Sequence, residues 1–401
     1  MTRPEPADVL PVFDIFEPDH AERKWEILGY AREHCPVFRT EAMGGMWVAT
    51  RHDHVRNVLE NPGVFSSSIP SIFPSPVPLP PIDLDPPLHA DFRRFLNPYM
   101  SRSYLLKFEP RIRAEVTGAL EGFLDLGECE FNRDFAVPVA SHILARVIFD
   151  EADEQRMARA LDAATRMGLE NTPDTFVDMA MVAGEFLAER EKGGAGADAR
   201  SAGAPLVRDD LLGSLLRATV EDGRPLTQEE RIGVITILFI GGLDTTRAAM
   251  GNIVLNIARD PALEDRVRDP GWIRSDMDEF LRYESPVTCL ARVVTRDTDL
   301  GDVHLRAGDR LLAHFASANR DEAHYERAGE LDFDVARAGN AAFGLGVHRC
   351  VGANLARLTL TIAFDELLSK ITNIRLLSEP RTTAGIVHHP EELHIGFDRI
   401  G

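Results

Sequence analysis

The sequence predicts a mainly α protein with a minor β region, folded as a single domain over residues 1–401. Apolar residues recur with the period of a helix over most of the chain, and one such segment extends from Thr227 almost to Pro261. The part after Ala291 instead alternates apolar and polar residues in short runs interrupted by glycines. A hydrophobic content of 44% and a charged content of 27% are ordinary for a soluble globular protein with a large core.

Two segments interrupt the helical pattern before the long helix. Ser66–Pro87 contains so many prolines that it can form neither a regular helix nor a central strand. Its apolar residues argue for an ordered, functional loop. Lys192–Asp210 consists mainly of small residues, so we expect a flexible surface linker within the domain.

The segment after Thr227 is expected to be the central helix of the fold. Thr227 and Glu230 have the spacing of a capping box at a first turn, and Pro261 lies just beyond the last turn. A helix of this length far exceeds the usual one and is apolar on most sides, so it must run through the core. Its longest apolar stretch, Ile232–Leu243, is shorter than a membrane span requires, which predicts a buried helix.

The net charge, the N-terminal residues and the cysteine spacing each argue against certain classes of protein. The formal net charge of −20 predicts an acidic surface and argues against a nucleic-acid partner. The N-terminal residues contain no apolar core of a signal peptide, so we expect a cytoplasmic protein without a membrane segment. The four cysteines are far apart and form no CxxC pair, which argues against a disulfide framework or a zinc site.

The stretch FGLGVHRCVG, from Phe343 to Gly352, places one cysteine in a glycine-rich bend just before a helix. The start of a helix favours the thiolate of Cys350, and glycines such as Gly346 let the backbone approach a bulky, flat group. An aromatic ring and His348 stand in the same stretch. A buried structural cysteine explains Cys350 taken alone, whereas a thiolate ligand to haem iron explains the whole pattern.

On these residues, the chain resembles the cytochrome P-450 superfamily of haem-thiolate monooxygenases. The resemblance covers essentially the whole chain and is closest to soluble bacterial members of the camphor-hydroxylase-like group, through FGLGVHRCVGANLAR, IGGLDTT and DPP…FRRF. It implies the cytochrome P-450 fold, with the long central helix over the haem, and haem b (iron protoporphyrin IX) as cofactor. Cys350 would be the iron ligand. The residues implied to lie against the cofactor are Gly241, Phe343, Gly346, His348 and Gly352.

A second match is GGLDTT, Gly241–Thr246, inside the long helix. Taken alone, Asp244 and Thr245 could be a solvated carboxylate and a threonine that bonds back to a helix carbonyl. The apolar run before them indicates a buried position, where a carboxylate without a purpose is costly. The resemblance implies that they are the catalytic acid–alcohol pair, which passes protons to dioxygen, and that the glycines leave space above the haem.

A third match is EFLR, in which Glu279 and Arg282 share one face of a helix that Pro286 stops. An exposed ion pair would explain the spacing equally well. By resemblance the two residues form a buried structural pair that braces the haem-binding core. The arginine that usually completes a three-membered network is replaced near Glu330 in this sequence.

The two carboxylates of haem need cationic or hydrogen-bonding partners. The resemblance assigns this task to His89, Arg93, Arg292 and His348, through their positions relative to the other motifs. Each of them, taken singly, would be an ordinary surface residue.

The substrate is expected between the proline-rich loop, the long helix and the strand after the EFLR helix. No tyrosine occurs between Asn61 and Asp85, where camphor hydroxylases hold their ketone, so a terpenoid or norisoprenoid of similar size is preferred to camphor. The candidate contacts are all apolar, which predicts a small hydrophobic substrate held by shape and burial, although each could equally be plain core. They are Phe73, Val77, Leu79, Ile237, Ile240, Val287, Leu290, Ile386 and Val387.

The chain has no flavin or iron–sulfur motif, so its electrons must come from another protein. The bacterial systems that it resembles use a [2Fe–2S] ferredoxin with a ferredoxin reductase. A basic patch for docking is expected at Arg94, Arg102, Arg349 and Arg357. The implied enzyme is a monomeric oxidoreductase that inserts one atom of O2 into its substrate. A haem-thiolate sensor and a peroxide-driven peroxygenase are the alternatives, and the acid–alcohol pair argues against both.

Overall fold

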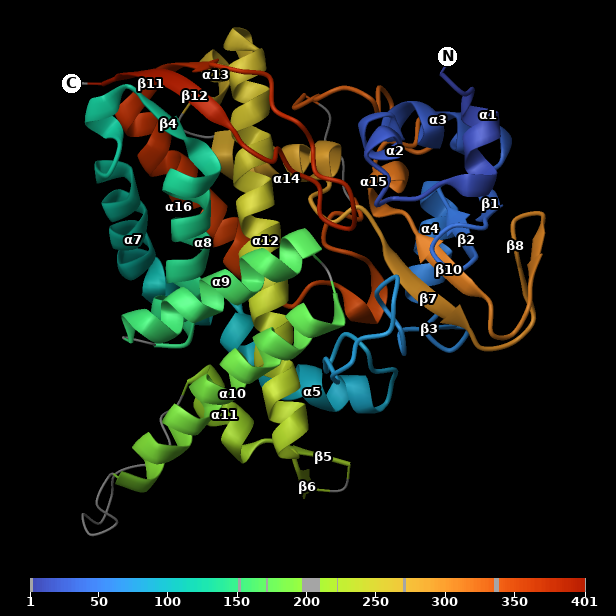
Figure 1. Ribbon diagram of the computed structural model, residues 1–401, viewed down its shortest axis with the longest axis horizontal. Helices are drawn as coiled ribbons and strands as arrows, with labels where there is room; N and C mark the ends of the chain where they lie inside the picture. Colours follow the sequence, from blue (N-terminus) through green and yellow to red (C-terminus); the bar gives the residue numbers. More distant parts are fainter. Residues whose placement is uncertain are drawn as a thin grey trace.

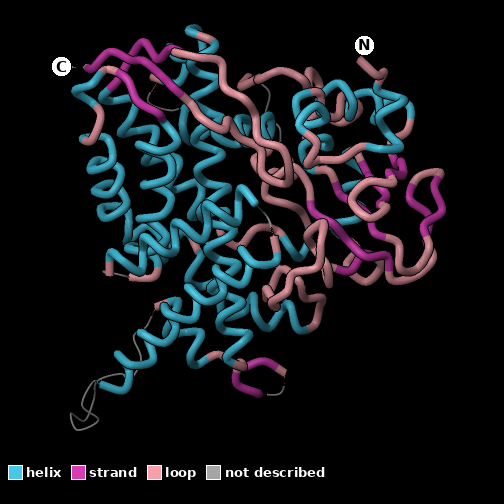
Figure 2. Tube along the Cα trace, in the orientation of Figure 1, coloured by secondary structure: helices cyan, strands magenta, loops and turns pink. Residues whose placement is uncertain are grey.

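The structure is a computed structural model that describes residues 3–150, 153–170, 172–196, 210–221, 223–269, 272–334 and 339–400. A large helical part lies beside a smaller part that holds the N-terminal helices and the main sheet (Figure 1). Strands are few and gather mainly in that smaller part and near the C-terminus (Figure 2). The predicted mainly α fold with a minor β region is confirmed.

The smaller part is built around a five-stranded sheet with the order β1-β2-β10-β7-β3. β2 and β10 are parallel, and the other neighbours are antiparallel. The alternating pattern after Ala291 corresponds to β7, the hairpin β8–β9 and β10, so the predicted strands form. Helices α1–α4 and α15 complete this part. The strands are β1 (Val37–Thr40), β2 (Met46–Ala49), β3 (Phe65–Ser66), β7 (Leu290–Val294), β8 (Thr298–Leu300), β9 (Val303–Leu305) and β10 (Arg310–Ala313), and the helices are α1 (Pro6–Val9), α2 (Pro18–Glu22), α3 (Lys24–His34), α4 (His52–Glu60) and α15 (Phe315–Ala318).

The helical part carries the main hydrophobic core, which is formed largely by α7, α8, α10, α12 and α16. A three-stranded sheet, β11-β12-β4, covers one end of it (Figure 1). The helices are α5 (Leu88–Leu96), α6 (Arg102–Leu105), α7 (Glu109–Glu121), α8 (Val137–His142), α9 (Glu154–Glu170), α10 (Pro173–Gly196), α11 (Leu211–Arg217), α12 (Gln228–Arg259), α13 (Pro261–Val267), α14 (Trp272–Glu284) and α16 (Ala353–Lys370), and the strands are β4 (Glu128–Glu130), β5 (Thr219–Val220), β6 (Arg224–Pro225), β11 (Ile371–Leu376) and β12 (His394–Arg399).

The helix α12 is the predicted central helix, and its first turn has the predicted capping box. The Thr227 hydroxyl accepts from the Glu230 N–H at 3.1 Å, and the Glu230 carboxylate accepts from the Thr227 N–H at 2.7 Å. An 18-residue window of α12 has a mean hydropathy of 1.4, the level of a membrane span, and half of that window is buried inside the protein. The core helix of a soluble protein has the same composition, so the window is weak evidence for a span.

The proline-rich loop has neither helix nor strand between Ser66 and Leu88, as its composition predicts. It is packed against α12 at Gly233, where a Cβ atom would lie 2.3 Å from the carbonyl oxygen of Pro78. Only glycine permits this approach, so the loop and the central helix are fixed to each other. The predicted linker Lys192–Asp210 falls mainly on residues 197–209, which lie outside the described residues.

Glu279 and Arg282 form a buried, bidentate ion pair on α14. The Nε and Nη2 atoms of Arg282 donate to the two carboxylate oxygens, each at 2.7 Å. Its Nη1 donates to the carbonyls of Asn319 at 2.6 Å and Ala328 at 2.8 Å, and Nη2 donates to the Glu330 carbonyl at 2.7 Å. Glu330 therefore contributes its backbone to this network, while its exposed carboxylate lies 4.0 Å from Arg327.

We predict that replacing Arg282 by methionine lowers the free energy of unfolding by about 3–5 kcal/mol, because it removes the guanidinium that compensates the buried Glu279 carboxylate. Urea unfolding followed by circular dichroism measures the change. Arg56→Met is the matched control, since Arg56 pairs with Glu60 at 3.1 Å on an exposed face. That control should cost below about 1 kcal/mol. Equal losses in the two variants would contradict the bracing role.

Candidate active site

An internal cavity of about 260 Å³ lies where α5, α12, α16 and β7 meet the loop before α16. Most of its wall is apolar. The polar wall residues are Cys350, three threonines that include Thr245 of α12, and a group of basic side chains around Arg292. The fold thus brings the predicted motifs, which are far apart in the sequence, onto one surface.

The loop from Phe343 to Gly352 is a tight bend closed by the Cys350 N–H, which donates to the Phe343 carbonyl at 2.8 Å. Phe343, Cys350 and Gly352 all line the cavity. Gly346 differs from the expectation, because it faces α4 instead of the cavity. Its φ is +67°, and a Cβ atom there would lie 2.3 Å from the carbonyl oxygen of Leu59. This glycine lets the cysteine loop pack directly on α4.

Cys350 has its exposed surface toward the cavity, deep inside the protein. Burial raises the pKa of its thiol, and the Gly352 N–H and the guanidiniums of Arg93, Arg349 and Arg357 act in the opposite direction. Arg93 is itself held by a hydrogen bond to the Arg349 carbonyl at 2.8 Å. A thiolate at this depth is stable when a metal ion on the sulfur completes the charge compensation.

His89, Arg93, Arg292 and His348, the residues expected to bind carboxylates, all lie on the cavity wall. The rings of His89 and His348 are 4.2 Å apart between centroids, and the Nε2 atom of each is buried without a hydrogen-bond partner among the described residues. Burial and the nearby guanidiniums lower the pKa of His89 to about 4 and that of His348 to about 3. Burial lowers the pKa of Arg292 to about 10. Two buried imidazoles without described hydrogen-bond partners, beside the guanidiniums of Arg93 and Arg292, fit an anionic ligand with two carboxylates.

On α12, Thr245 and Asp244 point to different surroundings. Thr245 lines the cavity and its hydroxyl donates to the Gly241 carbonyl at 2.6 Å, while a Cβ atom at Gly241 would meet only open space. Asp244 does not line the cavity. Its carboxylate pairs with Arg247 at 2.6 Å, and Arg247 also contacts His389 Nε2 at 3.1 Å. Burial lowers the pKa of His389, and Arg247 adds to this effect.

Of the apolar substrate candidates, Ile237, Val287 and Leu290 line the cavity. The proline-rich loop reaches it with Pro81 and Ile82, which are not among the predicted substrate contacts. A second unforeseen contribution comes from the end of α8 and the π-helical turns that follow it. These residues are Ala140, Ile143 and Leu144.

The remaining predicted substrate contacts do not line the cavity, because their side chains pack elsewhere in the protein. Phe73 is 54% exposed and stacks on Phe16 at 6.3 Å between ring centroids. Ile240 packs on the main core and Ile386 on the core of the N-terminal part. Val387 forms a β-bridge with Val287. Val77 is half-buried and Leu79 is buried within the loop, and neither forms part of the cavity wall.

Known proteins with this architecture share its fold over nearly the full length. The solved structure of cytochrome P450 CYP109Q5 from Chondromyces apiculatus superposes with a TM-score of 0.85 at 25% identity, covering 98% of this chain and 99% of that one. CYP101C1 superposes with a TM-score of 0.85 at 26% identity, covering 99% of both chains.

Sequence relatives agree with the structural ones. A probable cytochrome P450 127A1 of Sinorhizobium fredii is 31% identical over 86% of this chain and 80% of its own. Linalool 8-monooxygenase of Pseudomonas putida is 29% identical over 89% of this chain and 91% of its own. The sequence model of the cytochrome P450 family matches residues 275–385. The chain therefore belongs to the cytochrome P450 family: it is an oxidoreductase, a monooxygenase of a family that binds haem b through a cysteine thiolate.

We predict that Arg292→Gln accelerates the loss of haem by about tenfold or more, because a hydrogen bond to a charged group contributes about 1.5–3 kcal/mol. Transfer of haem to excess apomyoglobin, followed by absorbance, gives the rate. Arg296→Gln is the control, since Arg296 is exposed just beyond β7. Circular dichroism checks that both variants are folded. Equal rates in the wild type and Arg292→Gln would refute a carboxylate-binding role for Arg292.

Proposed function

We propose that the protein hydroxylates a small hydrophobic compound, of the size of a terpenoid or norisoprenoid, with O2 and two electrons from a [2Fe–2S] ferredoxin. The observation that carries the proposal is that Cys350, Thr245 and four carboxylate-binding candidates share one largely apolar cavity. We also propose that it works in the cytoplasm as a monomer.

Each residue group has a distinct task in this proposal. Haem b, when bound, would supply the activation of dioxygen and the transfer of one oxygen atom to the substrate. The Cys350 thiolate would ligate its iron. Arg93 and Arg292, together with His89 and His348, would hold its carboxylates by charge and hydrogen bonds. Phe343 would pack against the haem. The guanidinium of Arg357 lies over the Phe343 ring, 4.4 Å from its centroid.

The acid and the alcohol of α12 would control protons. Thr245 presents its hydroxyl oxygen to the cavity while its proton is engaged by the Gly241 carbonyl, so it can accept a hydrogen bond there. Asp244 is held outside the cavity by Arg247, which in turn contacts His389. We propose that its carboxylate takes protons from the solvent side and passes them toward Thr245 through water, after a rotation that loosens the pair with Arg247.

The substrate class rests on the lining of the cavity. Ile237, Val287, Leu290 and Ile82 are apolar, and the hydroxyl of the wall residue Thr245 already donates to the Gly241 carbonyl within α12. A substrate would therefore be selected by shape and burial, not by a hydrogen-bonding anchor. The relatives named linalool 8-monooxygenase and cytochrome P450-terp support a terpenoid.

The electron donor would dock on the cysteine side. Arg102 and Arg349 are exposed there. Arg94 is paired with Asp91 at 2.8 Å and Arg357 with Asp278 at 2.9 Å, so these two offer less free positive charge than the sequence suggests. The docking surface would be a small basic patch on an acidic protein, which favours an acidic ferredoxin.

The first test is a ferrous–CO difference spectrum followed by titration with terpenoid ketones and alcohols. We expect a strongly red-shifted Soret band that Cys350→His abolishes, because only thiolate ligation produces it. Binding of a substrate of the proposed class should then shift the ferric Soret band from the low-spin to the high-spin position. A red-shifted band without any shift across the panel would keep the monooxygenase and reject the terpenoid class.

A second prediction concerns Thr245. Thr245→Val should lower the ratio of product formed to NADH consumed by about tenfold or more, since general acid–base contributions are typically of that size or larger. NADH oxidation and product are measured in a reconstituted ferredoxin system. Thr236→Val is the matched control, because Thr236 also donates to a carbonyl of α12, at 2.8 Å, but lies off the cavity. Unchanged coupling, or peroxide-driven turnover that exceeds the NADH-driven rate, would favour the peroxygenase or sensor alternatives.

A further inference from the structure

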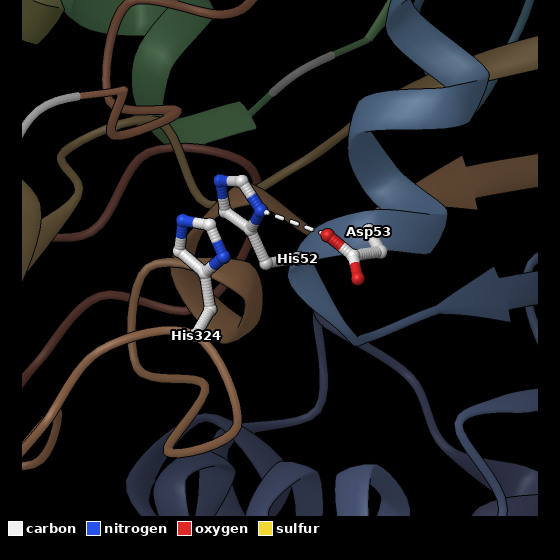
Figure 3. A group of neighbouring side chains, drawn as sticks. All are labelled: His52, Asp53 and His324. Carbon is white, nitrogen blue, oxygen red and sulfur yellow. Dashed lines mark ion pairs between the residues drawn. The ribbon is translucent and has the colours of Figure 1, made fainter.

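A second cluster of chemically active side chains lies outside the cavity. His52 and Asp53 are the first residues of α4, and His324 belongs to the segment that follows α15 (Figure 3). One ligand atom from each lies within 4.8 Å of the others. Neither the cavity nor the proposed reaction uses any of the three.

The Nδ1 atom of His52 has a lone pair without a hydrogen-bond donor among the described residues. The residue is 2% exposed, and its Nε2 lies 3.4 Å from the Gly339 carbonyl, which can only accept a hydrogen bond. Nε2 therefore carries the proton in the neutral ring, and Nδ1 is an acceptor. This Nδ1 is buried and has no hydrogen-bond partner among the described residues. It faces a carboxylate oxygen of Asp53 at 3.6 Å (Figure 3).

Two acceptors that face each other at this distance are stabilised by a cation between them. The contact of the other ring nitrogen with a backbone carbonyl is the arrangement that orients histidine ligands in metal sites. The Asp53 carboxylate is 89% exposed, so it can rotate toward an ion without losing a structural contact that the described residues provide.

His324 supplies the third ligand. Its ring stacks on that of His52, with centroids 3.4 Å apart and planes at 10° (Figure 3). In two parallel imidazole rings the nitrogen lone pairs point in parallel planes and do not converge on one point. One of the two rings must therefore turn before both can bind the same ion. His324 is exposed, and its side chain has no hydrogen bond to a described residue, so the turn exchanges ring contacts, with His52 and, edge-on at 4.5 Å, with Tyr325, for a bond to the ion.

We propose that His52, Asp53 and His324 form a binding site for a divalent transition-metal ion, with Zn²⁺ as the favoured occupant. Two imidazoles and one carboxylate are ligand types that Zn²⁺ takes, small side-chain rotations would bring them onto one ion, and water would fill the fourth position. The site would be structural, because it ties the start of α4 to the segment after α15. The other end of α4 packs on the cysteine loop at Leu59 and Gly346, so the ion would stiffen the support of that loop.

The test is calorimetric titration of untagged holoenzyme, freed of loosely bound metal by a chelator, with ZnCl₂. We expect one ion per chain in the wild type. His324→Ala and Asp53→Asn should each weaken binding by at least about tenfold, because loss of a ligand costs at least as much as loss of an outer partner. Both residues are exposed, so the variants should fold normally. Zn²⁺ should also raise the thermal midpoint of the wild type but not of His324→Ala.

His304→Ala is the matched control. His304 is an exposed histidine that pairs with Asp299 at 2.8 Å, so the variant removes the same ring from an ordinary surface pair. It should bind Zn²⁺ as the wild type does. Absence of stoichiometric binding, or binding that His324→Ala leaves unchanged, would overturn the proposal. Because the ferrous–CO spectrum reports Cys350 separately, failure here and failure of the haem assignment are distinguishable.

Discussion

The hydrogen bond from the Cys350 N–H to the Phe343 carbonyl closes the bend that places sulfur on the cavity wall. A thiol at that depth resists ionisation, and the surrounding structure works against this resistance. Three arginines supply positive charge near the sulfur: Arg93 from α5, Arg349 from the cysteine loop and Arg357 from α16. Gly346 lets the bend rest directly on α4. The site is thus organised around the requirement to keep negative charge on a buried sulfur.

A similar requirement acts on α12. The Thr245 hydroxyl donates its hydrogen bond within the helix, to the Gly241 carbonyl. The negative charge of Asp244 is paired with Arg247, which also contacts His389. The preceding residue, His388, belongs to a second polar group: its Nε2 lies 3.3 Å from a carboxylate oxygen of Glu284 and its Nδ1 lies 2.5 Å from Lys24 Nζ. Burial lowers the pKa of Lys24 to about 7. Two polar groups on adjacent histidines thus lie between the central helix and the N-terminal part, one reaching Asp244 through Arg247 and the other reaching Lys24.

How much the sequence could predict depended on whether a feature is local. The cysteine bend, the capping box of Thr227 and the Glu279–Arg282 pair are each contained in a few consecutive residues. Spacing alone predicted the capping box, whereas the burial of the Glu279–Arg282 pair and the place of Cys350 beside a cofactor followed from the family resemblance. The Arg247–His389 contact joins residues 142 positions apart, and no sequence pattern in either segment predicts it. The same holds for the apolar substrate candidates. Periodicity shows that such residues are buried, but not whether they face a cavity or a core.

The proline-rich loop shows why this distinction decides substrate choice. Because the loop is fixed on α12 at Gly233, the residues that reach the cavity are those just beyond that contact, Pro81 and Ile82. Residues before it, such as Phe73, turn toward the N-terminal part and stack there. A hydrophobic wall discriminates weakly between substrates that differ by a methylene, by a factor of about 10–200. Selectivity must therefore come from the rigid placement of the loop against the helix, which sets the shape of the space above the cysteine.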